Sequence, residues 1–266
     1  MARNNSFIKL EGTLDGLTFY RKNGESFVKT KNRVSKNRIM NDPAYRRTRE
    51  NMQEFGGSAR TAKALRESFS GILRLVGDTY ISARLSSVMR NICSYGTGVR
   101  GERVIDVVSH VDLLNGFNFN LNKPFDTQFN APANAPTIDL DRHVAKWEIP
   151  DFNTDAYVRV PEGATHFKLV LAAGYTSNYE WVPAIRGYEP VDEVVNGRGM
   201  VTYSAEIAVG GMVGNDTSLE VDMSSFGAVP VTSAIFAGTG IVFYQMVNGE
   251  LYELAQGHAM KIAVGG

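Results

Sequence analysis

The spacing of apolar residues changes near residue 100, and this change constrains the fold more than any other feature of the chain. Between residues 58 and 95, apolar side chains recur every three or four positions, as they do on amphipathic helices. From residue 103 onward the period becomes two, which is typical of strands. Helices and strands therefore occupy separate parts of the sequence, and this separation predicts an α+β fold.

The helical part has recognisable start and stop signals. The Asn-Asp-Pro sequence at 41–43 predicts a helix start, because an Asn or Asp side chain caps the first turn and proline fits the first helical position. We expect this helix to end at Gly56-Gly57 and Ser58 to cap a second helix, and we expect Gly77-Asp78 to end the second helix and cap a third. The predicted core-facing residues are Ala62, Leu65, Phe69, Ile72 and Leu73, then Ile81, Leu85, Val88, Met89 and Ile92.

Residues 101–266 are predicted to form an antiparallel β-sandwich of about eight or nine short strands. Asn248-Gly249 marks a tight hairpin within it, and the segment "NAPANAP" at 130–136 is interpreted as a loop or an internal boundary. The segments with strand patterns are "FNFNLN", "AYVRVP", "HFKLVLAAG", "GMVTYSAEIAVGG", "TSLEVDM", "GIVFYQMVNGELYEL" and "AMKIAVGG".

The first 30 residues are predicted to form a small meander of strands. Asn23-Gly24 is a hairpin signal, and Gly12 and Gly16 bracket another turn. Such a meander is too small to be stable alone, so its aromatic residues need a second surface, either the rest of the chain or a neighbouring subunit. We interpret it as an inter-subunit hairpin with the aromatic residues Phe7, Phe19, Tyr20 and Phe27. The predicted organisation is thus a hairpin and basic arm at 1–40, a helical region at 41–100 and the β-sandwich at 101–266.

The net charge of zero hides a division along the chain. Residues 1–100 hold 19 Lys and Arg against 8 Asp and Glu, whereas residues 101–266 hold 9 against 20. This division is explained by contact with a polyanion, by basic-to-acidic pairing between subunits, or by neutralisation within one chain.

A basic stretch, "KNRVSKNRIMNDPAYRRTREN" at 31–51, follows the meander, and its first part at 31–41 is predicted to be an extended connector. Two hypotheses account for it. Its cations either follow a nucleic-acid backbone without reading sequence, or they meet the acidic surface of a neighbouring subunit. The candidate contact residues are Lys29, Lys31, Arg33, Lys36, Arg38, Arg46, Arg47 and Arg49.

The motifs that would indicate an enzyme do not occur in the sequence. There is no G-x-S-x-G elbow, no Walker A or dinucleotide fingerprint and no HExxH motif, so we predict a non-enzymatic protein without a cofactor. The single cysteine, Cys93, excludes an intramolecular disulfide and is predicted to be a buried, unreactive thiol. If "DLDRH" were a strand, Asp139, Asp141 and His143 would share a face that could bind a divalent ion, but a solvated strand face or turn is the commoner explanation of such residues.

Two further observations bear on partners and location. Tyr179, Trp181 and Tyr188 could form a loop-end platform for a sugar or a peptide, or could serve packing. No apolar stretch is long enough to span a membrane, and residues 1–12 lack the apolar core of a signal peptide. We therefore expect no membrane contact and no cleaved signal, and a cytoplasmic or virion location.

Two stretches carry a resemblance to a known group. "GTLDGLTFYRKNGESFVKTK", followed by "NDPAYRRTRENMQEFGGSARTAKALR", is similar to the N-terminal signature of a family of uncharacterised Bacteroidota proteins. In that family a G-x6-F-Y hairpin leads to a T-R-E-N-x-x-E-F-G helix. The segment "GIVFYQMVNGELYEL" resembles a late hairpin of the same family. The resemblance implies the two-part architecture and an association with phage-like genes, and it supplies no catalytic residues.

These observations lead to three functional hypotheses. The first is a structural protein that self-assembles into a ring or filament through its basic N-terminal arm, most concretely a phage virion component. The second is a non-specific nucleic-acid-binding protein that uses the basic stretch. The third is a carbohydrate- or peptide-binding β-sandwich module.

Overall fold

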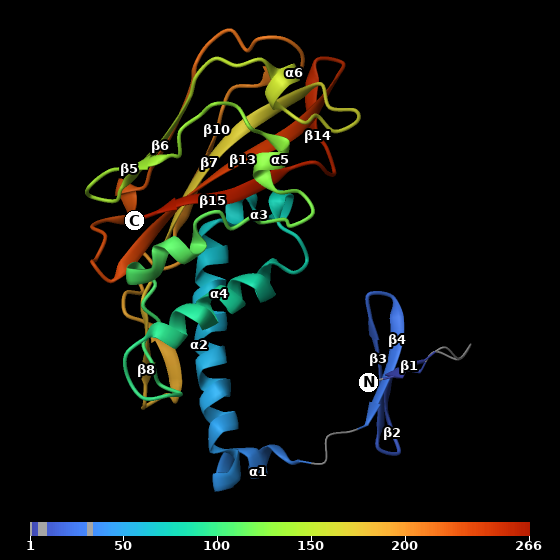
Figure 1. The fold of residues 1–266 in the computed structure, drawn as a ribbon, viewed down its shortest axis with the longest axis vertical. Coiled ribbons are helices and arrows are strands. Elements are labelled where there is room, and N and C mark those ends of the chain that lie inside the picture. Colours follow the sequence, from blue (N-terminus) through green and yellow to red (C-terminus); the bar gives the residue numbers. More distant parts are fainter. Residues whose placement is uncertain (1, 5–9, 31–33) are drawn as a thin grey trace. The chain divides into compact units, whose positions relative to one another are not determined.

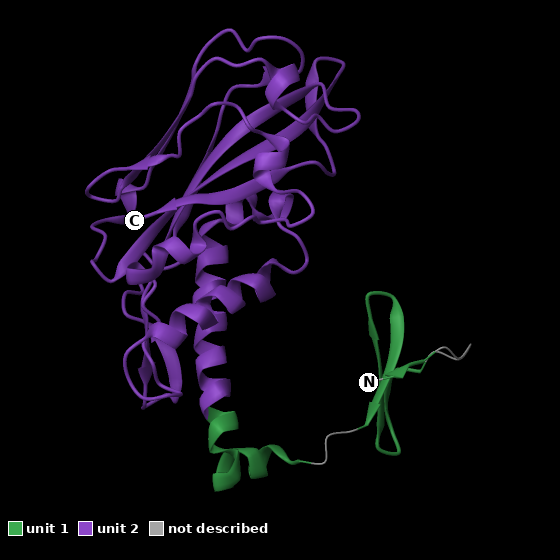
Figure 2. Ribbon diagram, viewed as in Figure 1, with its two compact units in different colours: residues 1–49 green, residues 50–266 purple. Residues whose placement is uncertain are grey.

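The computed structural model describes residues 2–4, 10–30 and 34–266, and within them the chain has the predicted α+β fold (Figure 1). Phe7, Lys31 and Arg33 lie outside the described residues. The chain divides into two compact units, residues 1–49 and residues 50–266, here called unit 1 and unit 2 (Figure 2). Unit 2 holds the sandwich and most of the helical residues, so it extends across the predicted boundary at residue 100.

Unit 1 contains a four-stranded antiparallel sheet in the order β1-β4-β3-β2. Both of its tight hairpins use residues with positive φ, Asp15-Gly16 at 42° and 80° and Asn23-Gly24 at 52° and 79°, as type I′ turns require. The Asn23-Gly24 hairpin is therefore confirmed. The strands are β1 (Ala2–Arg3), β2 (Gly12–Leu14), β3 (Leu17–Lys22) and β4 (Glu25–Thr30).

The second half of the expected connector is helical, which corrects the prediction of an extended segment over 31–41. Helix α1 spans Lys36–Asn41, and the Ser35 hydroxyl caps it by accepting a hydrogen bond from the backbone N–H of Arg38 at 3.2 Å. Asp42 then caps the 3-10 helix η1 (Pro43–Tyr45), as predicted, and accepts from the Ala44 N–H at 2.9 Å.

The long helix α2 (Arg46–Ser68) runs through Gly56-Gly57 without a break, so the predicted helix end at this pair is wrong. Gly57 is buried against the ring of Tyr188, and a Cβ built on it would lie 2.5 Å from the ring atom Cγ. Ser58 does not cap a helix, because its hydroxyl donates back to the Glu54 carbonyl at 2.7 Å. Position 57 requires glycine because α2 packs closely against Tyr188 there, and the helix continues through it.

Two shorter helices follow, α3 (Ser70–Val76) and α4 (Ile81–Tyr95). Asp78 lies between them and accepts a hydrogen bond from the Tyr80 N–H at 2.9 Å, but the N-cap residue of α4 is Tyr80 and no side chain caps this helix, so the predicted cap at Asp78 is wrong. All ten predicted core-facing residues of the helices contribute to one hydrophobic core, Leu73 and Val88 from its edge. None of the helices in the described part of the chain combines the length and apolar composition needed to cross a membrane.

Unit 2 contains three antiparallel sheets. The largest has the order β10-β7-β13-β14, with β11 paired to β7 and β15 paired to β13; the others are β12-β6-β5 and β8-β9. The strands are β5 (Thr137–Ile138), β6 (Val144–Ile149), β7 (His166–Ser177), β8 (Tyr179–Val182), β9 (Gly187–Pro190), β10 (Gly199–Tyr203), β11 (Ile207–Ala208), β12 (Thr217–Asp222), β13 (Ser233–Val247), β14 (Glu250–Glu253) and β15 (Ala259–Gly265). Short helices η2 (Val108–Leu114), α5 (Phe125–Gln128), α6 (Thr154–Tyr157) and η3 (Ser224–Phe226) connect them.

The largest sheet is covered on both faces. Along β7, Phe167, Leu169 and Leu171 join the core shared with β6 and β12, whereas Val170 and Ala172 join the core shared with the helices. This division follows the alternation of side chains along a strand. The result is the predicted β-sandwich, with α2, α3 and α4 packed on the outer face of its larger sheet (Figure 1).

Two predicted strands, residues 117–122 and 156–161, do not form. Residues 117–119 lie beside β15 and form backbone hydrogen bonds with Met260 and Ile262, but only one isolated bridge, Asn118–Lys261, forms there and no strand ladder. Residues 154–157 form α6, which the Asn153 side chain caps. In both places local polar and capping interactions replace the pairing that alternation alone suggested.

A buried ionic cluster fastens α2 to α4 and to the loop at 96–103. The Glu54 carboxylate has no solvent exposure, forms an ion pair with Arg90 at 2.9 Å and accepts hydrogen bonds from Arg103 at 2.8 and 3.0 Å and from the Gly101 N–H at 2.8 Å. Burial raises the pKa of Glu54, but these donors outweigh it and hold the pKa below its ordinary value. Glu54 belongs to the "TRENMQEFG" stretch, so this part of the resemblance has a structural role here.

Candidate assembly interface

On one face of the sheet of unit 1, a group of apolar side chains lies beside Arg21, Ser26 and Thr30. Directly opposite residues in the antiparallel ladder share a face, and the pairs Leu14–Leu17, Phe19–Val28 and Ala2–Val28 all lie on the same one. We call Ala2, Leu14, Leu17, Phe19 and Val28 the apolar face. Its side chains are poorly covered: 66% of Leu14 and 41% of Leu17 are exposed, and Phe19 and Val28 are only half-buried.

The opposite face of this sheet carries more polar and charged side chains, and its side chains interact with one another. Tyr20 and Phe27 stack with their ring centroids 5.7 Å apart, and the Lys29 ammonium lies 5.4 Å from the centre of the Tyr20 ring. Arg3 pairs with Glu25 at 3.2 Å across the sheet. These aromatic rings thus have partners within their own sheet.

The structure therefore divides the predicted inter-subunit hairpin residues between two faces. Phe19 lies on the apolar face, whereas Tyr20 and Phe27 lie on the other. Leu14, Leu17 and Val28 complete the apolar face, and the sequence analysis missed them because it grouped residues by aromatic character. Counting every second residue outward from the two Gly-containing turns would have placed these side chains on one face of the sheet.

Five of the predicted basic contact residues are exposed in unit 1: Lys29, Lys36, Arg38, Arg46 and Arg47. Arg38 forms an ion pair with Asp42 at 3.2 Å and its guanidinium lies 5.8 Å from the Tyr45 ring centre. The Ala44 N–H and Arg38 together lower the pKa of Asp42. Arg38 is thus held on one side of α1 but keeps 62% of its side chain exposed.

Arg49, another predicted contact, has a structural role. Its side chain is half-buried and donates to the Ile39 carbonyl at 2.8 Å and to the Asp42 carbonyl at 2.9 Å. These are the carbonyls at the end of α1, which the helix itself leaves without donors. Arg49 therefore fastens α1 to the start of α2 within unit 1.

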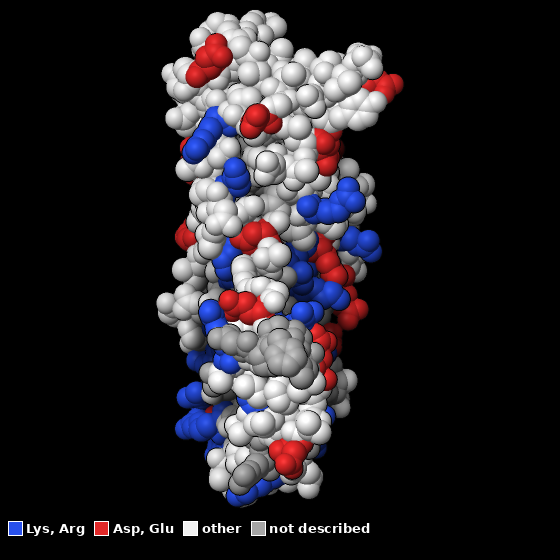
Figure 3. All heavy atoms as spheres, turned by 90° about the vertical axis from the view of Figure 1, so that its right-hand side faces the viewer, with Lys and Arg blue, Asp and Glu red and all other residues white. Residues whose placement is uncertain are grey.

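The charge division of the sequence coincides with the two units. Residues 1–49 hold 12 Lys and Arg against 4 Asp and Glu, and residues 50–266 hold 16 against 24, so the two net charges are +8 and −8. The upper part of Figure 3, which is the end of the sandwich near α6 and β14, shows mainly uncharged atoms with scattered charges of both signs. This face of unit 2 has no uniformly basic patch.

The aromatic residues proposed as a sugar or peptide platform are mostly buried. Only 4% of Tyr179 and 1% of Tyr188 are exposed, and the Tyr188 hydroxyl donates to the Arg103 carbonyl at 2.9 Å. Trp181 is half-buried and packs edge-on against Tyr188. These rings pack the β8-β9 hairpin onto the helices, so they cannot form an exposed stacking surface together.

Residues 139–143 form a turn and not a strand. Arg142 has a φ of 59°, and the Asp139 carboxylate accepts from the backbone N–H groups of His143 and Val144 at 2.7 and 2.8 Å. Asp139, Asp141 and His143 therefore do not share a strand face. Within the described ranges, no group of three His, Cys, Asp or Glu side chains is arranged to hold a metal ion.

Cys93 is a free, fully buried thiol in the helical core, as predicted. Burial raises its pKa, with the nearby Glu54 carboxylate acting in the same direction. A thiol in this environment is a poor nucleophile because its thiolate form is disfavoured.

Comparisons of the chain with protein-family profiles, curated proteins and solved structures find no match.

Proposed function

We propose that the protein is a structural component that self-assembles, with the apolar face of unit 1 from one copy packing on a neighbouring copy. A phage virion component is the form of this proposal that the resemblance of the N-terminal segment suggests. The observation that carries it is the apolar face itself, on which Leu14 and Leu17 remain exposed in a sheet that is too small to bury them within its own unit.

Charge supports the same arrangement. Unit 1 carries +8 and unit 2 carries −8, so contact between unit 1 of one copy and unit 2 of another is favourable, and contact between two like units is not. A contact of this kind joins different surfaces of successive copies. It generates a ring if the rotation closes and a filament if it does not.

Replacing both leucines with glutamate tests the proposal. We expect the intact protein to sediment at low salt as a multiple of its 29.2 kDa chain mass. The Leu14→Glu/Leu17→Glu variant should sediment as a monomer, because two carboxylates on the apolar face would have to be desolvated in the contact. The measurement is sedimentation velocity, with circular dichroism to show that the variant is folded.

A control variant places the same charges on the same strands but on the other face. Thr13 and Thr18 lie opposite each other on the polar face and share a hydrogen bond of 3.1 Å. Thr13→Glu/Thr18→Glu should therefore remain assembled. A monomeric intact protein would refute self-assembly, and equal behaviour of the two variants would refute the role of the apolar face. Absorbance at 260 nm that salt removes would instead favour the nucleic-acid hypothesis.

A further inference from the structure

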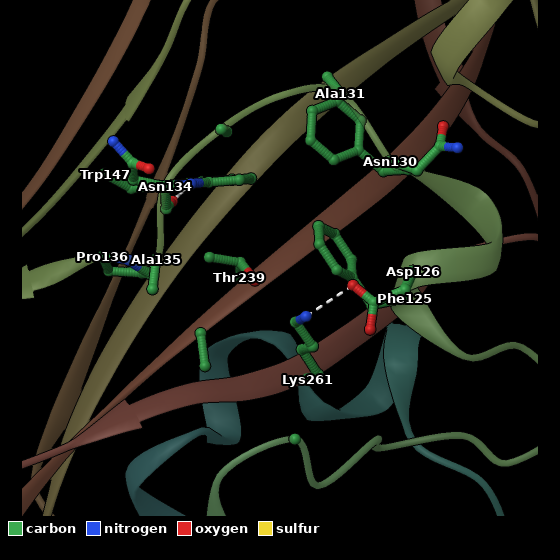
Figure 4. Close-up of a pocket in the computed structure, with 14 residues that line it drawn as sticks. Phe125, Asp126, Asn130, Ala131, Asn134, Ala135, Pro136, Trp147, Thr239 and Lys261 are labelled. Carbon is green, nitrogen blue, oxygen red and sulfur yellow. Dashed lines mark hydrogen bonds and ion pairs between the residues drawn. The ribbon is translucent and has the colours of Figure 1, made fainter.

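A pocket opens into the sandwich beside α5 (Figure 4). The β12-β6-β5 sheet lies over β7 and β10. It does not extend over β13 and β15, which are covered by α5 and the loop at 129–136. The Trp147 indole N–H donates to the Asn134 carbonyl at 3.1 Å and fastens this loop over the sheet. The pocket is the space that the loop and α5 leave above β13 and β15.

The size and walls of the pocket suit a single six-membered ring. Its volume is about 180 Å³, and a cavity of about 150 Å³ is known to admit benzene. Phe125, Phe129 and Trp147 all line the pocket; the two Phe rings are tilted toward each other, and each packs in a T-shaped arrangement with Trp147. A larger ligand would require the loop to move.

The pocket carries no net charge. Of its lining residues, all of which the structure describes, only Asp126 and Lys261 are charged, and they pair at 2.6 Å. The Lys261 ammonium also lies 5.6 Å from the centre of the Phe125 ring. A charged ligand would have to break this pair or lie beside a like charge, so a neutral ligand is favoured.

The floor of the pocket contains a hydroxyl that lacks a partner. Thr239 lies directly opposite Lys261 in the β13–β15 ladder, so both side chains share the face that lines the pocket. Only 2% of Thr239 is exposed, and no hydrogen bond among the described residues involves its hydroxyl. This hydroxyl is therefore available to pair with a ligand that enters the pocket.

We propose that this pocket binds one neutral sugar ring. Such a ring has C–H faces that pack on aromatic walls and hydroxyls that pair with Thr239 and with the Asp126–Lys261 pair. This site differs from the Tyr179–Tyr188 platform considered from the sequence, and it does not depend on the assembly proposed above.

Trp147 provides a direct optical probe of the pocket. The only other tryptophan, Trp181, is replaced by phenylalanine in every protein used, so fluorescence reports Trp147 alone. The probes are the methyl pyranosides of glucose, galactose, mannose and N-acetylglucosamine, titrated to about 50 mM, well above a millimolar Kd. We expect a saturable change with at least one of them. Glucuronate, which adds a carboxylate to the same ring, should bind at least about tenfold more weakly than glucoside.

Two threonine variants separate a binding role from a structural one. Thr239→Val keeps the shape and removes the hydroxyl, and it should weaken binding by about tenfold. Thr176 is an equally buried threonine of β7 whose hydroxyl also has no partner, and it lies outside the pocket, so Thr176→Val should leave binding unchanged. Ala133→Phe, which fills the pocket from the loop, should abolish binding and serves if Thr239→Val does not fold.

The outcomes that overturn the proposal are equally defined. No saturable change with any of the four glycosides would show that the pocket holds only water. Binding that Ala133→Phe leaves intact would place the sugar elsewhere. Equal affinity of Thr239→Val and the parent would show that the hydroxyl does not contact the ligand.

Discussion

Replacing Glu54 with alanine should lower the free energy of unfolding by about 3–5 kcal/mol. The carboxylate is fully buried, forms an ion pair with Arg90 and accepts hydrogen bonds from Arg103 and the Gly101 N–H. Removing the carboxylate leaves two guanidinium groups and the Gly101 N–H without this acceptor. No other acceptor can replace it, because the surroundings of these donors are already packed. The loss therefore combines desolvation of these donors with the cavity left by the side chain.

Urea denaturation followed by circular dichroism measures this loss. The control is Glu67→Ala on the same helix, where the exposed carboxylate pairs with Lys63 at 3.4 Å one turn away. Such a surface pair contributes about 0.3–0.5 kcal/mol, so the control should change stability little. Similar losses in the two variants would contradict the structural role of the Glu54 cluster.

The pH dependence of stability gives a second measurement of the same cluster. The pKa of Glu54 is lower in the folded protein than its ordinary value of 4.5. The unfolded chain therefore binds the proton more readily than the folded one, and stability falls as the pH drops below 4.5 through the folded pKa. The parent should lose stability over this range more steeply than Glu54→Gln, which has no carboxylate to protonate at this position.

Alanine at the two adjacent glycines of α2 should have opposite effects. Gly56 is exposed, with no atom within 4 Å of a built Cβ, so Gly56→Ala should raise stability by about 1 kcal/mol through helix propensity. At Gly57 the added methyl would meet Tyr188 ring atoms at 2.5, 2.6 and 2.9 Å. We expect Gly57→Ala to lower stability by about 1–3 kcal/mol despite the same gain in propensity.

The Tyr188 ring cannot easily move away from an added methyl. It is 1% exposed, and its hydroxyl is tied to the Arg103 carbonyl at 2.9 Å. Thermal or urea denaturation of the two single variants gives the difference directly, and each serves as the control for the other. Equal stability of the two variants would mean that α2 does not pack on Tyr188 through Gly57.

The predicted interface was partly visible in the sequence. The hairpin at Asn23-Gly24 could be predicted directly from the sequence, because turn chemistry is a local property. Which aromatic residue lies on which face could not be read without the register. The ladder places Phe19 with Leu14 and Leu17, and it places Tyr20 on Phe27.

The sugar pocket was not predicted at all. Its residues come from α5, the loop at 129–136, β6, β13 and β15, and Thr239 and Lys261 meet only through strand pairing. The Pro/Ala/Asn composition of 130–136 predicts a loop or an internal boundary and no binding site, and the aromatic residues between 179 and 188 are the more visible candidates in the sequence. A site assembled from segments more than 100 residues apart has no local signature in one sequence.

The sequence by itself determined much of the local structure of this protein: the Asn-Gly hairpins, the helix start that Asp42 caps, the apolar helix faces and most of the long strands. These features depend on neighbours a few residues apart, which the sequence displays. Only the tertiary structure decided that α2 continues through Gly56-Gly57, that residues 117–122 leave the strand conformation, and that Glu54 becomes the centre of a buried ionic cluster. Each outcome depends on a contact with a distant segment: Tyr188 for α2, β15 for residues 117–122 and Arg103 for Glu54. The free energy of such a contact exceeds the weak local preference that it overrides.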